Sequence, residues 1–370
     1  MAMFDWIFKA RETATVPSMD GALRPNTALD DAEVLAEAEA PDNLVLSGAS
    51  VLYSSGNGLF ELGKSGGKSR SRPRAGSKAL QRFESDVLAL AAAPDGGLAI
   101  ALKGKGIAVS GGAHDGTMLA GIGPKQLAAV TSMAFDGADT LIVSIGSEKH
   151  DVGDWQRDLL ELGESGSVWR IPLGGGEAQC IARNLRYPSG VLCTEGSVVI
   201  SEAWRHRLIA ISADKPNTIR VLLDDLPGYP GRLSARGRDG AWLSVFAPRS
   251  QLVEFVLRED LFRRHMMEMI GEEYWIAPAL RAGKSYKEPM QVGAVKTLGV
   301  HKPWAPSRSY GLAVRLGLDL MPVASLHSRA DGHRHGVTSC LEHQGRVIVT
   351  CRGDDVVVAT DAEQERGGAA

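Results

Sequence analysis

Several features that define other protein classes are scarce in this 370-residue sequence. It has four cysteines, and none of them lies at the CxxC spacing of a metal knuckle or in a dense disulfide framework. Acidic and basic residues nearly balance, at 44 against 41, which argues against a dedicated nucleic-acid-binding protein. No apolar run approaches the roughly 18 residues that a membrane-spanning helix needs. We therefore expect a cytoplasmic chain with reduced thiols and no transmembrane segment.

Glycine, by contrast, is abundant, at 43 residues, and some of these glycines mark tight turns. Six dipeptides pair a residue that tolerates the left-handed conformation with glycine, which is what a tight β-hairpin requires. The glycines of these dipeptides are Gly48, Gly96, Gly137, Gly196, Gly240 and Gly345. Each turn is followed within four residues by a short apolar strand and then by another, as in residues 98–102 and 106–110.

The intervals between these glycines are 48, 41, 59, 44 and 105 residues. A period in the forties with about four strands per unit is typical of a β-propeller, so six turns predict six blades. Two intervals are long because they contain insertions, at 146–165 and at 258–320. Within the second, residues 259–280 have apolar side chains at helical spacing. We expect a helical insertion after the third strand of blade 5, which we assign to residues 251–257.

The sequence thus predicts one all-β domain, a six-bladed β-propeller over residues 34–361. Junctions between outer and inner strands repeat along it, and the first, at 34–44, precedes blade 1. We therefore expect the N-terminal strand to complete blade 6 beside residues 356–361, which hides the open sheet edges. In this interpretation residues 1–33 are an N-terminal extension and residues 362–370 a disordered tail.

Functional residues are expected where the junctions and the loops after each second strand open on one face around the axis, because loops on a rigid scaffold usually carry function. The polar residues of the junctions are Asp42, Asn43, Asp86, Ser132, Ser189, Arg232 and His335. The second-strand loops add Asn57, Lys103, His150, Glu202, Trp204, His206, Arg249 and Arg352.

Three short runs resemble the strictosidine synthase-like proteins, namely YPSGV at 187–191, EAWRHR at 202–207 and LPGYP at 226–230. The helical insertion in blade 5 adds to this resemblance, which is closest over residues 130–260. Such proteins belong to a superfamily of six-bladed propellers that also holds gluconolactonases, regucalcin and paraoxonases. The resemblance implies this fold and the hydrolysis of an ester or a lactone, while leaving open whether the chain is an enzyme.

Metal-dependent members of that superfamily hold a calcium or other divalent ion on the axis through a blade-1 Glu and two Asn or Asp residues of later junctions. At these three places the chain has Asp42 with Asn43, then Ser189, then Gly231 with Arg232. Arginine is permanently charged and cannot ligate a cation. We therefore predict no metal and no cofactor, and a degenerate calcium site is the alternative.

The same substitutions favour an anionic small molecule as the ligand. We expect Arg232, Arg249 and His335 to face the axial mouth, because an arginine fork binds a carboxylate or phosphate with two bonds. The alternative is that Arg232 forms a structural ion pair with Asp42 or Glu202.

Three functions stay open. A hydrolase of esters or lactones needs a group that activates water, for which His335, Glu202 and Asp42 are the candidates. A non-catalytic ligand-binding protein and a protein-interaction scaffold are the alternatives. Strictosidine synthesis is not expected, because Thr338 stands at the place of the catalytic glutamate and cannot act as a carboxylate base. The expected ligand contacts are Arg232, Arg249, Ser189, Trp204, Tyr187 and Thr338.

The basic stretch at residues 64–78 is expected to be an exposed loop. Contact with an anionic membrane or with nucleic acid is the alternative for this stretch.

Overall fold

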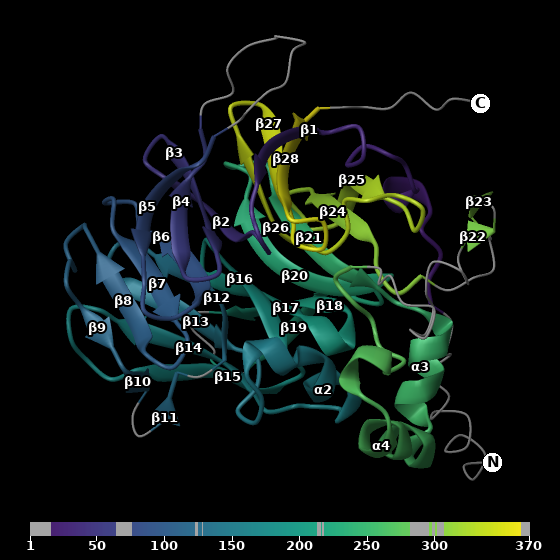
Figure 1. Cartoon of the computed structure of the whole chain (residues 1–370). Helices are drawn as coiled ribbons and strands as arrows, with labels where there is room; N and C mark the ends of the chain where they lie inside the picture. Colours follow the sequence, from purple (N-terminus) through teal and green to yellow (C-terminus); the bar gives the residue numbers. More distant parts are fainter. Residues whose placement is uncertain are drawn as a thin grey trace.

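A computed structural model describes residues 16–63, 76–122, 125–127, 129–212, 216, 218–281, 296–297, 300–301 and 307–363. Most of the basic stretch, residues 64–75, and the end of the expected tail, residues 364–370, lie outside this described part. Six four-stranded antiparallel sheets stand around a common axis, which confirms the six-bladed propeller (Figure 1). No helix among the described residues is long and apolar enough to cross a membrane. The expected cytoplasmic location stays a prediction.

The blades follow one another along the chain, each ordered from the axis outward. Blade 1 consists of β2 (Asp42–Ser47), β3 (Ser50–Ser55), β4 (Gly58–Glu61) and β5 (Lys78–Arg82). Blade 2 consists of β6 (Val87–Ala92), β7 (Leu98–Leu102), β8 (Gly106–Ser110) and β9 (Met118–Leu119). Blade 3 consists of β12 (Val130–Asp136), β13 (Thr140–Ile145), β14 (Gly166–Pro172) and β15 (Gln179–Leu185).

The second half of the ring repeats this order. Blade 4 consists of β16 (Pro188–Thr194), β17 (Ser197–Glu202), β18 (Arg207–Ser212) and β19 (Ile219–Leu223). Blade 5 consists of β20 (Gly228–Ala235), β21 (Ala241–Pro248), β24 (Gly311–Leu316) and β25 (Pro322–Ser328). Blade 6 consists of β26 (Val337–His343), β27 (Arg346–Cys351), β28 (Val356–Asp361) and the N-terminal β1 (Glu33–Glu37).

Short elements lie outside the blades. Two-stranded ribbons are formed by β10 (Gly121–Ile122) with β11 (Lys125–Gln126), and by β22 (Lys296–Thr297) with β23 (Val300–His301). The α-helices are α2 (Trp155–Leu160), α3 (Gln251–Arg258) and α4 (Asp260–Met269). The 3₁₀ helices are η1 (Gly21–Leu23), η2 (Val152–Asp154), η3 (Ala203–Arg205) and η4 (Glu272–Tyr274).

The ring closes in the expected way, through the N-terminal strand. β1 pairs antiparallel with β28, from Glu33 opposite Ala359 to Glu37 opposite Val356. The segment before β1 continues along blade 5, where the Leu29 amide donates to the His327 carbonyl (3.0 Å). The N-terminal strand therefore completes the last blade, and the two ends of the propeller domain hold each other in place.

Hydroxyl groups tie neighbouring blades together near the axis. Thr131 of blade 3 donates to the carbonyl of Pro188 in blade 4 (2.6 Å), and Ser189 of blade 4 donates to the carbonyl of Pro230 in blade 5 (2.6 Å). The inner strands also approach closely, since a Cβ at Gly190 would lie 2.3 Å from the carbonyl oxygen of Gly231. These buried polar contacts fix how the inner strands meet and so fix the shape of the axial opening.

The expectation for blade 5 is wrong in one respect. Residues 251–257 do not form its third strand: they form most of α3, and the third strand is β24. The insertion therefore follows the second strand, β21, and not the third. Val253 and Val256 are buried and lie three residues apart, which is helical spacing, whereas Leu252 and Phe255 are exposed.

The helical spacing expected within residues 259–280 is confirmed by α4, which begins at Asp260 and ends at Met269. Among its apolar side chains Met266 is buried, whereas Leu261 is 85% exposed and Met269 is 80% exposed.

Candidate functional site

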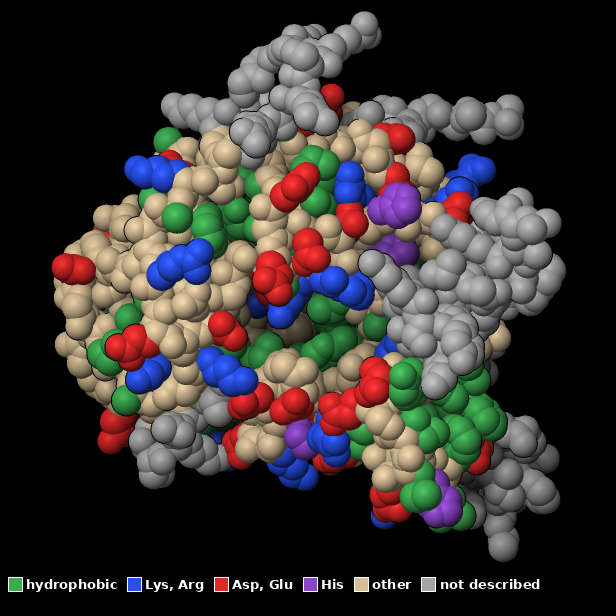
Figure 2. Space-filling view, in the orientation of Figure 1, with side chains coloured by type: hydrophobic (Ala, Val, Ile, Leu, Met, Phe, Trp, Pro, Cys, Tyr) green, Lys and Arg blue, Asp and Glu red, His purple; other side chains and the backbone are tan. Residues whose placement is uncertain are grey.

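A cavity of about 1450 Å³ opens on the propeller axis. Figure 2 shows its mouth as a hollow with charged side chains around a partly apolar interior. All six blades contribute to its wall, together with the N-terminal strand. Its polar lining includes Asp42, Asn57, Asp86, Lys103, Asp151, Ser189, Arg232, Thr338 and Arg352. Its apolar lining includes Tyr53, Trp155, Phe246, Leu280 and the ring of Tyr187.

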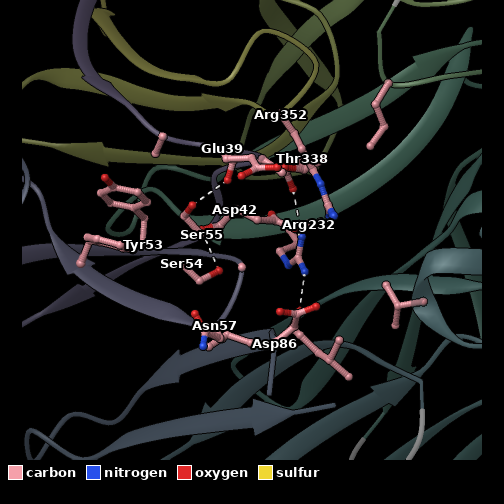
Figure 3. Close-up of a pocket in the computed structure, with 18 of the residues that line it drawn as sticks. Glu39, Asp42, Tyr53, Ser54, Ser55, Asn57, Asp86, Arg232, Thr338 and Arg352 are labelled. Carbon is pink, nitrogen blue, oxygen red and sulfur yellow. Dashed lines mark hydrogen bonds and ion pairs between the residues drawn. The ribbon is translucent and has the colours of Figure 1, made fainter. Parts of the chain in front are cut away.

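Arg232 lies at the centre of this cavity and joins four blades (Figure 3). It projects from β20 in blade 5, and its Nη1 donates to Asp42 Oδ1 in blade 1 (2.7 Å). Its Nη2 donates to the carbonyl of Leu88 in blade 2 (3.0 Å), and Nη1 also reaches the carbonyl of Thr338 in blade 6 (3.4 Å). Of the two alternatives left open by the sequence, the ion pair with Asp42 is therefore present.

A second guanidinium approaches the same carboxylate. Arg352, which follows β27 in blade 6, places Nη1 3.4 Å from Asp42 Oδ2. Its side chain is 40% exposed, and its other N–H groups have no partner among the described residues. Both oxygens of Asp42 thus face guanidinium groups, while Arg352 keeps donors available to a molecule in the cavity.

Two further charged groups lie at the rim. Lys103 pairs with Asp151 (3.3 Å). The carboxylate of Asp86, in the connection between β5 and β6, has no hydrogen-bond or ion-pair partner among the described residues. Asp86 therefore keeps both carboxylate oxygens available to a molecule in the cavity, as do Glu37 and Glu39 of the N-terminal segment, which also line it.

The centre of the cavity around Asp42 and Arg232, which we call the hub, does not fit a divalent cation. The guanidinium of Arg232 occupies the position against Asp42 that a cation would take, and guanidinium cannot ligate a metal. Among the described residues, no group of three or more His, Cys, Asp or Glu side chains could hold a metal ion. Asn43 Oδ1 is enclosed without a hydrogen-bond partner, and by itself this oxygen makes no metal site.

An aromatic cluster forms the wall on the side of blades 3 to 5. Tyr187 stacks on Trp204 with ring centroids 4.3 Å apart, and Trp155 meets Phe246 edge-on at 5.4 Å. Trp204 lies behind the lining and donates its indole N–H to Asp158 Oδ1 (2.7 Å). This side of the cavity is therefore apolar, with Trp155 at the cavity surface and Trp204 supporting it.

Five of the residues predicted for the site line the cavity, namely Asp42, Tyr187, Ser189, Arg232 and Thr338. The other four, Glu202, Trp204, Arg249 and His335, do not. The expectation that Arg249 and His335 face the axial mouth is thus wrong.

Charged partners hold two of these four residues away from the cavity. Glu202 is fully buried and accepts hydrogen bonds from Arg205 Nη1 (2.6 Å) and Arg207 Nε (2.7 Å). Arg249 donates to Asp225 (2.6 Å) and to Glu254 (3.1 Å). A buried charge with such partners serves the fold, because leaving it unpaired is costly.

His335 is held in a separate buried network. Its Nδ1 lies 2.8 Å from Ser309 Oγ, and its Nε2 lies 2.8 Å from the carbonyl oxygen of Arg329. The ring must therefore donate from Nε2 and accept at Nδ1. Burial lowers the pKa of His335 below its usual value.

The predicted site residues do not include Asp86, which lies in a junction, or Lys103 and Arg352, which lie in loops after second strands. Their common signal is position, since each follows the end of a strand at the axial face. Trp155 comes from the blade-3 insertion, and the strand pattern gives no signal for where an inserted helix will lie.

No protein-family model and no curated protein sequence matches the chain. Solved structures do match it. A gluconolactonase from Xanthomonas campestris is 13% identical, with a TM-score of 0.54, and the match covers 93% of this chain and 96% of that one. Regucalcin from Agrobacterium tumefaciens, a calcium-binding protein, is 11% identical, with a TM-score of 0.53, over 89% of this chain and 92% of that one.

These structural neighbours are gluconolactonase- and regucalcin-like six-bladed propellers. At such identities the likeness shows the fold alone. The resemblance to strictosidine synthase-like proteins in particular stays a prediction.

Proposed function

We propose that the axial cavity binds a small molecule with a lactone or ester group and hydrolyses it without a divalent metal. The observation that carries this proposal is the convergence of Arg232 and Arg352 on Asp42 inside the cavity. Positive charge fixed at this place can stabilise the oxyanion that forms when water attacks a carbonyl. The structural likeness to a gluconolactonase supports the choice of reaction.

In the proposed hydrolysis, Asp86, Arg352 and Arg232 have different roles. A water molecule attacks the carbonyl carbon and transfers its proton to Asp86, which is an unpaired carboxylate of the lining. The negative charge that develops on the carbonyl oxygen is stabilised by the available N–H groups of Arg352, with Arg232 adding fixed charge beneath. The bond to the leaving oxygen then breaks, and that oxygen takes the proton from Asp86. The products are an alcohol and a carboxylic acid, which releases its remaining proton to solvent and becomes a carboxylate; they are one molecule when the substrate is a lactone.

Product and substrate charge agree with this arrangement. Hydrolysis creates a carboxylate, and an arginine with available donors binds a carboxylate with two bonds. The anionic ligand expected from the sequence is in this proposal the product, or a substrate that already carries an acid group.

The test is a panel of δ-gluconolactone, γ-butyrolactone and 4-nitrophenyl acetate, with calcium or with chelator. We expect turnover that chelator does not reduce. Asp86→Asn should lower kcat about 100-fold, as is usual when a general base is lost. Glu84→Gln is the matched control, because Glu84 lies in the same connection, pairs with Lys105 and is exposed. It should leave kcat unchanged.

Three results would count against the proposal. Loss of turnover in chelator would show that a metal is needed. Equal rates for Asp86→Asn and wild type would show that Asp86 is not the general base. Calorimetric binding of the lactones without any turnover would identify the chain as a non-catalytic ligand-binding protein.

A further inference from the structure

Tyr187 has an unusual backbone for its place in the fold. It precedes β16 with a φ of 58°, in the left-handed region that bulky residues rarely adopt. Such backbone conformations persist only where the surroundings fix them, and they concentrate at functional sites. Its side chain lines the axial cavity and is otherwise buried.

Two neighbours, Trp204 and Gly146, fix the position of the Tyr187 ring. It stacks on Trp204 at 4.3 Å with an interplanar angle of 24°, and Trp204 is in turn held by its bond to Asp158. Asp158 is 1% exposed, so this support is itself part of the buried structure. A Cβ at Gly146 would lie 3.0 Å from Tyr187 Cε2, so the absence of a side chain at this glycine leaves room for the ring.

The hydroxyl of Tyr187, in contrast, is not bound to anything in the described part of the protein. A buried tyrosine hydroxyl usually finds a hydrogen-bond partner. Tyr229 in the same aromatic cluster also has none, and its oxygen is fully enclosed. The Tyr187 oxygen is not among the enclosed atoms, so this cavity-lining side chain ends in a donor that has no protein partner among the described residues.

The electrostatic surroundings keep this donor protonated. Burial raises the pKa of Tyr187 well above its usual value, and the carboxylate of Asp158 raises it further, while Arg232 and Arg352 act in the opposite direction. Arg232 and Arg352, which line the same cavity as Tyr187, are the groups that bind the acyl oxygen in the proposed function.

We propose that the Tyr187 hydroxyl donates a hydrogen bond to the acyl oxygen of the substrate, beside Arg352. This inference rests on the proposed function and names one more substrate-binding residue of that site. A rigid neutral donor recognises an oxygen acceptor at a fixed position, whereas the arginines supply charge. The ring of Tyr187 with Trp155 and Phe246 then faces the carbon atoms next to the acyl group, so the preferred substrate is a lactone or ester with an apolar ring or chain there.

The test compares Tyr187→Phe with Tyr229→Phe. Both substitutions remove only a hydroxyl from the same cluster, and the second hydroxyl is enclosed and away from the cavity. We expect Tyr187→Phe to lower kcat/KM about 100-fold for a good substrate of the panel, as does removal of an oxyanion donor in other enzymes. Its melting temperature should stay that of wild type. Tyr229→Phe should keep both the activity and the fold.

A second measurement separates this inference from the proposed function. Wild-type turnover with equal kcat/KM in Tyr187→Phe would overturn the role of Tyr187 and leave the hydrolase intact. Absence of turnover in wild type would overturn the hydrolase. In that case calorimetry with phenylacetate decides about Tyr187: weaker binding by Tyr187→Phe than by Tyr229→Phe supports the donor, and equal or absent binding overturns it.

Discussion

Three histidine side chains are buried in this ring, and burial lowers the pKa of each. They are His206, His327 and His335. For His327, which is 0% exposed, burial lowers the pKa to about 4. Its Nδ1 lies 3.0 Å from the Tyr310 hydroxyl and its Nε2 lies 2.7 Å from the Ser325 hydroxyl. Hydroxyl groups can satisfy a neutral imidazole at both nitrogens, but they provide no negative charge for a protonated one.

We predict that His327 makes the fold sensitive to mild acid. Its pKa in the folded state lies below the ordinary value of 6.5, so its contribution to stability is complete above pH 6.5 and is lost as the pH falls toward 4. The loss in the free energy of unfolding should be about 3 kcal/mol over this range. Urea unfolding at pH 7, 5.5 and 4.5 measures it. His327→Gln should flatten the pH dependence, and His333→Gln, at an exposed position, should not. Equal slopes for His327→Gln and wild type would contradict the prediction.

Single residues also show where sequence reasoning ends. Strand order places Arg232 in a junction between an outer and an inner strand, and so predicts that it lies near the axis with the other junctions. Its choice of partner does not, because a long side chain can reach several acceptors and only the folded hub shows that Asp42 is the nearest. The prediction that His335 faces the axial mouth is wrong for another reason. Ser309, which binds its ring, comes after an insertion whose path the strand pattern cannot give.

At the scale of elements, the strands of the blades could be predicted because their signals are local. A hairpin turn and a short alternation of apolar residues fix a strand without reference to the rest of the chain. The same local pattern misleads at residues 251–257, since a short apolar run is compatible with a strand or a helix. What decides for α3 is tertiary packing. Val256 joins a buried cluster with Leu160 and Trp275, which come from distant parts of the sequence.

We predict that the two faces of α3 differ sharply in their contribution to stability. Val256→Ala should lower the free energy of unfolding by about 2 kcal/mol, because it leaves a cavity in that cluster. Phe255→Ser, on the exposed face of the same helix, should change it by less than about 0.5 kcal/mol. Chemical denaturation followed by circular dichroism measures both. Equal losses for the two substitutions would contradict this prediction.

At the scale of the whole molecule, the side chain of Arg232 connects four of the six blades. Arg232 extends from blade 5 and contacts blades 1, 2 and 6 through Asp42, Leu88 and Thr338. The contacts of Arg232 with Asp42 and Leu88 couple blade 5 to blades 1 and 2, which are not its neighbours in the ring. It also neutralises a carboxylate that would otherwise be largely buried without a full counter-charge. The positive charge that a bound ion would supply is thus part of the chain.

We predict that divalent metal does not stabilise the native protein, whereas it does stabilise a variant with the hub charge reversed. A ligand that binds only the folded state, at a concentration of 100 times its Kd, adds about 2.7 kcal/mol to the free energy of unfolding. This would raise the melting temperature by several degrees. Calcium or chelator should shift the melting temperature of wild type by less than about 1 °C. Arg232→Asp adds a second carboxylate to a region that already holds Asp42 and the carbonyls of Leu88 and Thr338, and oxygen donors of this kind suit calcium. This variant should melt below wild type in chelator and recover part of the loss in calcium. Arg232→Met, which adds no oxygen ligand, should be destabilised without any recovery. A saturable rise in the melting temperature of wild type with calcium would contradict the assignment of the hub cation to Arg232.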